Sequence, residues 1–220
     1  MAADEQYDAG TTAEDYVAGS AAHADEDAAR LFLRRQLESP PRSGNVLDIG
    51  CGNGLDLMAY SSIGLKKLFG IDPSQKFIAD ARRTLGNLAE VQEGTFEKIP
   101  YADDSFDAVV SRFALHYSND IPRSYTEVAR VLKQGGVFAL VVSHPCADAL
   151  ETPDADDNIS ITLFGGSVRI SFPQHRLGEY FSDEFLRTFD VKAVYEYCGH
   201  EQDRGANGLP NALCFAAIKR

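Results

Sequence analysis

Short apolar segments alternate with amphipathic ones along the middle of the chain. Five segments predict strands, at residues 46–49, 67–71, 88–92, 107–111 and 137–142. The last holds six apolar residues in a row, which suits a parallel strand covered on both faces. Strands separated by helices favour a doubly wound parallel sheet.

Two helices between these strands are predicted by apolar side chains three or four positions apart. Ser74 is expected to cap the first, whose buried side would carry Phe77, Ile78, Ala81 and Leu85. The second would bury Ile121, Tyr125, Val128, Ala129 and Leu132. We expect Gly135-Gly136 to end this second helix.

The two ends of the chain depart from this alternation. An amphipathic helix is predicted at residues 25–38, with its apolar positions at Ala28, Leu31, Phe32 and Leu37. Other elements are predicted beyond residue 157: a β-hairpin at 158–172 around Gly165-Gly166, a short helix at 182–189, and two antiparallel edge strands at 191–197 and 212–218. The fold class is therefore α/β, with a single Rossmann-like, doubly wound seven-stranded sheet, helices on both faces, an N-terminal helical segment and a β-hairpin insertion.

Charge narrows the range of partners. The chain has 33 acidic and 21 basic residues and a formal net charge of −12, which would repel a polyanion, so we expect no nucleic-acid partner. The first 29 residues contain eight Asp or Glu and no Lys or Arg, which excludes a signal or transit peptide. No apolar run approaches the ~20 residues that cross a bilayer. We expect a cytoplasmic protein with no membrane partner, and a homodimer remains open.

The four cysteines show no metal-binding pattern. Cys51, Cys146, Cys198 and Cys214 have no CxxC spacing, so we expect free thiols and no metal site.

A glycine-rich loop, Gly50-Cys51-Gly52-Asn53-Gly54, follows the first predicted strand. A dinucleotide-binding fold uses G-x-G-x-x-G, but Leu55 and Leu57 stand where the third glycine would fall in the two registers. No P-loop motif is present either. The loop therefore fits a nucleotide-like ligand without the phosphates that those motifs bind.

Two acidic residues near the loop indicate what that ligand is. Asp48 would repel a pyrophosphate but attract an ammonium group. Asp72, in Gly70-Ile-Asp72-Pro73-Ser at the end of the second strand, can accept hydrogen bonds from both ribose hydroxyls. Free ribose hydroxyls, no phosphate and a cationic amino-acid moiety together describe S-adenosylmethionine.

Four stretches, in order and correctly spaced, resemble class I S-adenosylmethionine-dependent methyltransferases of the small-molecule branch related to ubiquinone and menaquinone C-methyltransferases. They are the glycine loop after Val46-Leu-Asp48-Ile, Phe69–Ser74, Gly94–Val110 and Arg130–Val137. The resemblance covers residues 46–142. It implies cofactor contacts from Asp48, Gly50, Cys51, Gly52, Asn53, Gly54, Asp72, Pro73, Thr95, Phe96 and Ser111, and from Tyr7 and Tyr16 in a leading segment that folds over the cofactor in such proteins.

The sequence departs from the family at Thr95. The family usually places an aspartate after the glycine there, to accept from the adenine amino group; Gly94-Thr95 offers a neutral hydroxyl instead. Adenine recognition is then expected to depend also on the Phe96 backbone and apolar packing. Tyr7 and Tyr16 could equally pack on the outside of the protein.

Three histidines are candidate catalytic bases for a methyl acceptor. His116 follows the fourth strand, where family members place substrate-facing residues, and His144 ends the fifth. His175 follows the predicted hairpin and could point inward as part of a lid. For each, a structural or surface role is the competing interpretation.

A length of 220 residues fits one α/β domain, so we expect a single domain over residues 1–220. We divide it into an N-terminal helical cap (1–44), a cofactor-binding core (45–143), a substrate lid (144–181) and a C-terminal helix and strands (182–220). The predicted function is methyl transfer from S-adenosylmethionine to an O, N or C nucleophile of a small-molecule metabolite. Two alternatives remain: a methyltransferase acting on tRNA or protein, and a non-catalytic S-adenosylmethionine-binding protein.

Overall fold

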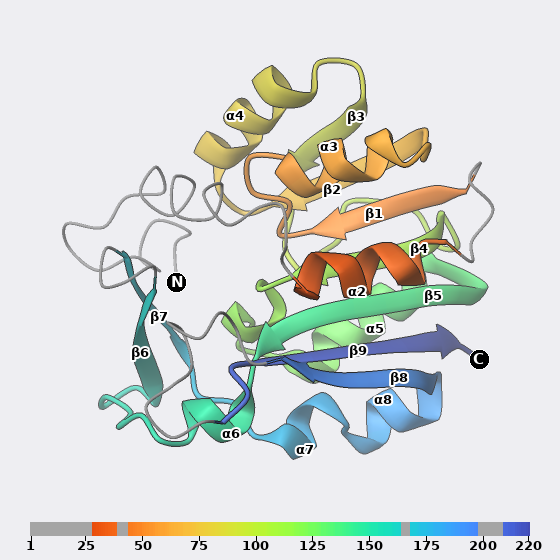
Figure 1. The fold of residues 1–220 in the computed structure, drawn as a ribbon. Helices are drawn as coiled ribbons and strands as arrows, with labels where there is room; N and C mark the ends of the chain where they lie inside the picture. Colours follow the sequence, from red (N-terminus) through yellow and green to blue (C-terminus); the bar gives the residue numbers. More distant parts are fainter. Residues whose placement is uncertain (1–27, 39–43, 164–167, 198–208) are drawn as a thin grey trace.

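The computed structural model describes residues 28–38, 44–163, 168–197 and 209–220. Seven strands form one sheet in the order β3-β2-β1-β4-β5-β9-β8 (Figure 1). Their bounds are β1 Asn45–Ile49, β2 Lys67–Asp72, β3 Ala89–Glu93, β4 Phe106–Arg112, β5 Leu132–Ser143, β8 Phe189–Tyr197 and β9 Ala212–Lys219. The first five are parallel, and β9 pairs antiparallel with both β5 and β8. The predicted seven-stranded α/β fold is confirmed.

Helices cover both faces of the sheet and bury two hydrophobic cores. One face carries α2 (Ala28–Gln36), α3 (Leu55–Ser62) and α4 (Gln75–Leu85), whereas the other carries α5 (Ile121–Val131), α7 (Leu177–Tyr180) and α8 (Asp183–Thr188). Two short elements follow strand ends: η2 (Leu115–Tyr117) after β4 and α6 (Pro145–Asp148) after β5. No helix within the described ranges is long and apolar enough to cross a membrane.

The helix α4 agrees with its sequence pattern in detail. Ser74 Oγ accepts from the backbone N of Phe77 at 3.3 Å, which confirms the predicted cap. Phe77, Ile78, Ala81 and Leu85 are all buried, as predicted.

The end of α5 was predicted wrongly. The helix stops at Val131, and Leu132 already belongs to β5, where it pairs with Phe106. Gly135 (φ +73°) and Gly136 lie inside β5, at the point where the pairing with β4 shifts register. The glycines therefore accommodate an irregularity in the strand rather than a helix end.

The buried side of α2 also differs from the prediction. Leu31 is 46% exposed, whereas Ala29, Leu33 and Leu37 are buried at a spacing of four residues. Tertiary packing thus rotates the apolar stripe away from the pattern read along the chain. Residues 25–27 of the predicted helix lie outside the described residues.

The predicted hairpin is confirmed as β6 (Asn158–Leu163) paired antiparallel with β7 (Val168–Pro173). It stands beside the carboxyl ends of the parallel strands, separate from the main sheet (Figure 1). Ile159, Val168, Ile170 and Phe172 form its own small core, against which Tyr117 packs. Gly165-Gly166 lie outside the described residues.

Cys51, Cys146 and Cys214 are free thiols, and Cys198 is not among the described residues. Within the described ranges, no group of three or more His, Cys, Asp or Glu side chains is arranged to hold a metal ion.

Candidate functional site

A cavity of about 460 Å³ opens at the carboxyl ends of β1, β2 and β4. The strand order of the sheet reverses between β1 and β4, and the cavity lies at this point. This is the usual ligand position in an open α/β sheet. Eight of the predicted cofactor residues line it: Gly50, Cys51, Gly52, Asn53, Asp72, Pro73, Thr95 and Phe96. Asp48, Gly54 and Ser111 do not, and Tyr7 and Tyr16 lie outside the described residues.

The glycine loop needs its glycines at two positions in particular. Gly50 has φ +75°, and a Cβ there would lie 2.2 Å from Ala114 Cβ. Gly54 has φ +85° and precedes α3, where a Cβ would approach Leu85 within 2.6 Å. The loop can therefore turn tightly and expose bare backbone to the cavity.

Asp72 connects the end of β2 to this loop. Its Oδ2 accepts from the backbone N of Gly52 and its Oδ1 from the backbone N of Ser74, both at 2.9 Å. Burial raises the pKa of Asp72 to about 6, although these two N–H donors act in the opposite direction. Each carboxylate oxygen has a second lone pair, so both can still accept from a ligand.

Asp48 lies beneath the loop rather than in the cavity wall. The Asp48 side chain is buried. Burial raises the pKa of Asp48, and the nearby Asp56 carboxylate adds to the effect while Arg112 opposes it. The positive charge of a bound cation would favour its ionised form.

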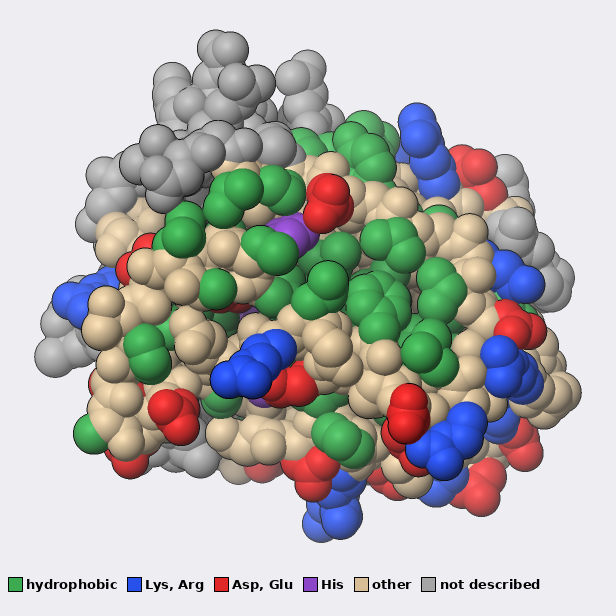
Figure 2. Space-filling model, turned by 90° about the horizontal axis from the view of Figure 1, so that it is seen from below, with side chains coloured by type: hydrophobic (Ala, Val, Ile, Leu, Met, Phe, Trp, Pro, Cys, Tyr) green, Lys and Arg blue, Asp and Glu red, His purple; other side chains and the backbone are tan. Residues whose placement is uncertain are grey.

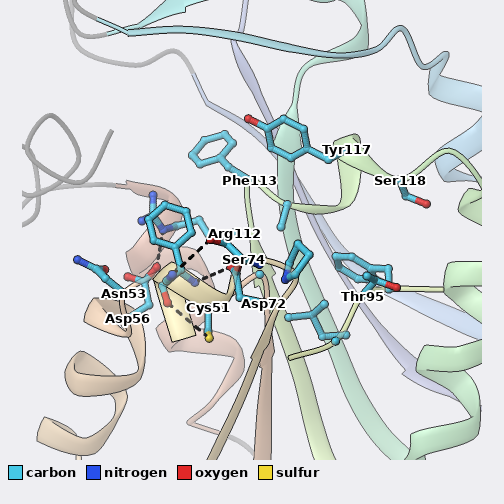
Figure 3. A pocket seen from close by; sticks show the side chains of 18 of the residues that line it. Cys51, Asn53, Asp56, Asp72, Ser74, Thr95, Arg112, Phe113, Tyr117 and Ser118 are labelled. Carbon is cyan, nitrogen blue, oxygen red and sulfur yellow. Dashed lines mark hydrogen bonds and ion pairs between the residues drawn. The ribbon is translucent and has the colours of Figure 1, made fainter. Parts of the chain in front are cut away.

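A buried ion-pair group at the cavity was missed by the sequence analysis. Asp56, in the first turn of α3, accepts from Arg30 Nε of α2 at 2.6 Å and from Arg112 Nε at the end of β4 at 2.7 Å. All three residues line the cavity, and Figure 3 shows Arg112 reaching Asp56. The pKa of Asp56 is lowered because the two arginines outweigh the effect of burial. The position of Arg112, directly after the fourth strand, was the available signal.

Two aromatic residues after β4 form another part of the wall. The rings of Phe113 and Tyr117 lie together at one end of the cavity (Figure 3). Phe113 has φ +53°, an unusual conformation for a bulky side chain, and the Arg112 guanidinium lies 5.7 Å from the centre of its ring. These aromatic faces provide an apolar surface beside the predicted cofactor residues.

The loop after β3 supplies Thr95 and Phe96. Thr95 and Lys98 exchange two backbone hydrogen bonds of 3.3 Å, which hold the loop as a tight turn. Phe96 is buried, and both residues line the cavity. Figure 3 shows Thr95 on the opposite side of the cavity from Asn53. Ser111 is buried within β4, where its Oγ has no partner among the described residues.

None of the three candidate histidines lines this cavity. His116 is buried in η2, and its Nδ1 accepts from the backbone N of Ser143 at 3.5 Å. Burial, with a contribution from nearby His175, lowers the pKa of His116 to about 3. Its imidazole is therefore neutral, with the proton on Nε2.

His144 caps α6, and both of its ring nitrogens have partners. Its Nδ1 accepts from the backbone N of Cys146 at 3.1 Å, and its Nε2 lies 3.0 Å from Glu196 Oε1. His175 differs, because only its Nδ1 is engaged, at 2.9 Å from Glu179 Oε2. The Nε2 of His175 is buried without a partner among the described residues.

Comparison with known proteins agrees with this geometry. Residues 47–140 match the family model described as "Methyltransferase domain". The chain is 39% identical over 101 residues to "Uncharacterized methyltransferase YcgJ" of Bacillus subtilis, covering 44% of this chain and 39% of that protein. It is 36% identical over 108 residues to "Demethylmenaquinone methyltransferase" of Chlorobaculum parvum, covering 49% of this chain and 44% of that protein. Residues 47–140 are therefore similar to methyltransferase domains.

The similarity in fold extends beyond the segment that the family model matches. The crystal structure of an S-adenosylmethionine-dependent methyltransferase from Mesorhizobium loti superposes with a TM-score of 0.69 at 23% identity, covering 89% of this chain and 99% of that one. The chain spans less than half the length of the curated relatives named above. The comparisons therefore establish the fold and a similarity to methyltransferase domains over residues 47–140, while the activity of the whole protein is a matter for proposal.

Proposed function

We propose that the protein transfers a methyl group from S-adenosylmethionine to an O, N or C nucleophile of a small molecule. The observation that carries this proposal is the gathering of the glycine loop, Asp72 and the Thr95-Phe96 loop around one cavity. These three segments come from the ends of three adjacent strands. The sequence predicted that Asp72 contacts the ribose and that the Thr95-Phe96 loop contacts the adenine of the same ligand.

The residues of the cavity fit this cofactor. Asp72 would hold the ribose hydroxyls, and Thr95 and Phe96 the adenine. Arg30, Asp56 and Arg112 combine two guanidinium groups with a carboxylate, which suits the zwitterionic amino-acid end. When bound, S-adenosylmethionine supplies a methyl group that is already activated by its sulfonium centre, so the protein has chiefly to align that group with the acceptor.

Charge favours a small acceptor over tRNA. The net charge of −12 opposes a polyanion, and on the face in Figure 2 Lys and Arg side chains are interspersed with Asp and Glu rather than gathered into a basic patch. We propose that residues 144–181 form the lid over this acceptor. The cytoplasmic location and a possible homodimer stay predictions.

The fold alone leaves the reaction open. One relative, 27% identical over 114 residues, is named "Arginine-hydroxylase NDUFAF5, mitochondrial" in Homo sapiens. The deciding experiment is calorimetric titration with S-adenosylhomocysteine and with NADH, followed by transfer of labelled methyl groups to metabolite, tRNA and protein fractions. We expect S-adenosylhomocysteine alone to bind and the metabolite fraction to be labelled. Binding of NADH instead would refute the proposal, and cofactor binding without a labelled product would indicate a non-catalytic protein.

Cofactor affinity should decrease at low pH. Asp72, with a pKa of about 6, must be ionised to accept from both ribose hydroxyls, and Asp48, whose pKa is also raised, must be ionised to attract the cationic moiety. Below pH 6 we expect binding of S-adenosylmethionine to weaken by about tenfold for each pH unit. The raised pKa of Asp72 also affects folding, because the folded state binds the Asp72 proton more tightly than the unfolded state does. The contribution of Asp72 to stability is therefore greatest at low pH and is lost as pH rises from about 4 to 6. Calorimetric titrations from about pH 5 to 8 test this, and an affinity independent of pH would contradict it.

Thr95→Asp is expected to bind S-adenosylhomocysteine at least as tightly as the natural protein. Thr95 lines the cavity, and a carboxylate is a stronger acceptor for the adenine amino group than a hydroxyl. Thr95→Val, which keeps the shape but removes the acceptor, is the matched control and should bind several-fold more weakly. A large loss of affinity in Thr95→Asp, measured by calorimetry, would show that adenine lies elsewhere.

A further inference from the structure

A second group of polar side chains is buried beside the cofactor cavity, between the end of β5 and the hairpin. Its members are His116, Ser143, Asp148, His175 and Tyr180, each less than one tenth exposed. Ser143 joins two of them, because its backbone N donates to His116 Nδ1 and its Oγ donates to Asp148 Oδ1 at 2.5 Å. His175 lies against Tyr180, with ring centres 5.8 Å apart.

Two polar atoms of this group are unpaired. His175 Nε2 and Tyr180 Oη are both buried and have no hydrogen-bond partner among the described residues. Buried polar groups are nearly always paired, and leaving one unpaired costs free energy. Two such atoms on neighbouring side chains therefore indicate a ligand group that pairs with both.

The chemistry of the two atoms is complementary. Glu179 Oε2 lies 2.9 Å from His175 Nδ1, so Nδ1 carries the proton and Nε2 presents its lone pair. Burial, followed by the charges of Asp148 and Glu179, raises the pKa of Tyr180 well above its ordinary value, so its hydroxyl remains a donor. A ligand hydroxyl can donate to His175 Nε2 and accept from Tyr180 Oη at the same time.

The group adjoins the cofactor cavity through Tyr117. Tyr117 lines that cavity, and its ring centre lies 4.5 Å from that of His116 and 5.7 Å from that of Phe172 in the hairpin. The two histidines are close, because His175 contributes to the lowered pKa of His116. Aromatic rings therefore connect this group to the cofactor cavity, which suits a flat ligand ring.

We propose that His175, oriented by Glu179, is the general base for methyl transfer, and that the acceptor is a phenol or an enol whose hydroxyl lies between His175 Nε2 and Tyr180 Oη. This inference rests on the proposed function. Phenols and enols are acidic enough for an imidazole to take their proton, whereas an alkyl hydroxyl is a far weaker acid. An amine would have to use its nucleophilic lone pair to accept from Tyr180, and a carbon acid would leave both atoms poorly paired.

The proton and the electrons balance within this arrangement. As the acceptor oxygen forms its bond to the methyl carbon, its proton passes to His175 Nε2. The bond between that carbon and sulfur breaks, and its electron pair stays on sulfur. The imidazolium is stabilised by the Glu179 carboxylate until it releases the proton to solvent. Glu179 is thus a positioning residue, since it acts only through His175.

The first test uses para-nitrophenol as the probe, with S-adenosylhomocysteine present. At a pH one unit below the pKa of the free phenol, we expect the bound form to be mostly ionised, detected by the absorbance of the phenolate. His175→Phe should abolish this signal and Glu179→Gln should reduce it several-fold. His144→Asn is the matched control, because His144 is another buried histidine beside a glutamate, but its Nδ1 is occupied by Cys146 N. It should leave the signal unchanged.

The second test requires no catalytic turnover. Nitrogen NMR of the histidine side chains should show the His175 proton on Nδ1, and the Nε2 resonance should shift when para-nitrophenol is added. Three results would each overturn the inference. They are a proton on His175 Nε2, an undiminished phenolate signal in both folded His175→Phe and folded Glu179→Gln, and absence of para-nitrophenol binding. Calorimetry with S-adenosylhomocysteine on the same samples distinguishes these outcomes from failure of the proposed function. If the proposed function is wrong, the natural protein itself will not bind S-adenosylhomocysteine.

Discussion

Replacing Asp56 with alanine is expected to lower the free energy of unfolding by about 3–5 kcal/mol. The Asp56 carboxylate accepts from two guanidinium groups at 2.6 and 2.7 Å, and none of the three side chains is more than 14% exposed. Its removal leaves Arg30 and Arg112 buried without this counter-charge. Because Arg30 belongs to α2, we also expect α2 to lose its protection from hydrogen exchange before the sheet does.

Urea unfolding of Asp56→Ala beside Asp103→Ala measures this effect. Asp103 accepts from Arg130 Nη1 at a similar 2.8 Å, but its side chain is 73% exposed, so water screens the pair. The Asp103 variant should lose less than about 1 kcal/mol. Equal losses in the two variants would contradict the view that burial makes the Asp56 group important.

Elements defined by local patterns were predictable from the sequence. In α4, the cap at Ser74 and the four buried residues depend only on the spacing of side chains along one helix. The hairpin was recognisable for a similar reason, since two β-prone segments flanked a pair of glycines. In α2, by contrast, Leu31 proved exposed because Arg30 is fixed by Asp56, which lies 26 positions away and gives no local signal.

The site residues also fell into a group that was predictable from the sequence and a group that was not. The glycine loop and Asp72 were predictable because residues that end parallel strands meet at one edge of the sheet. The contribution of Arg112 and Phe113 was missed because it depends on the direction of side chains after β4, and Phe113 adopts an uncommon left-handed backbone conformation.

The roles of the histidines were decided by contacts that only the folded structure shows. His144 was a candidate base, yet Glu196 in β8 engages its Nε2 across 52 positions. His175 became the stronger candidate through a contact within one turn of helix, to Glu179, together with burial of Nε2 beneath the hairpin. Strand ends identify the region of a site, but tertiary contacts decide which nitrogen is left for chemistry.

Gly50→Ala should severely impair cofactor binding and destabilise the protein. The new Cβ would lie 2.2 Å from Ala114 Cβ, and the residue would be held at φ +75°. Overpacking of this kind costs about 1–3 kcal/mol and the left-handed conformation about 1–2 kcal/mol. The loop would have to move away from Ala114, so we expect the affinity for S-adenosylhomocysteine to fall by about thirtyfold or more.

Two further variants separate collision from backbone strain. Gly52→Ala also has a positive φ, +53°, but its Cβ would meet nothing within 4 Å, so it should lose only the strain energy. In Gly50→Ala combined with Ala114→Gly, the nearest remaining atom is Ala114 Cα at 3.7 Å, so the collision is removed. The double variant should therefore recover most of the stability and affinity lost in Gly50→Ala, as measured by urea unfolding and calorimetry. If it recovers neither, close contact between the glycine loop and the segment after β4 is not what shapes the cofactor site.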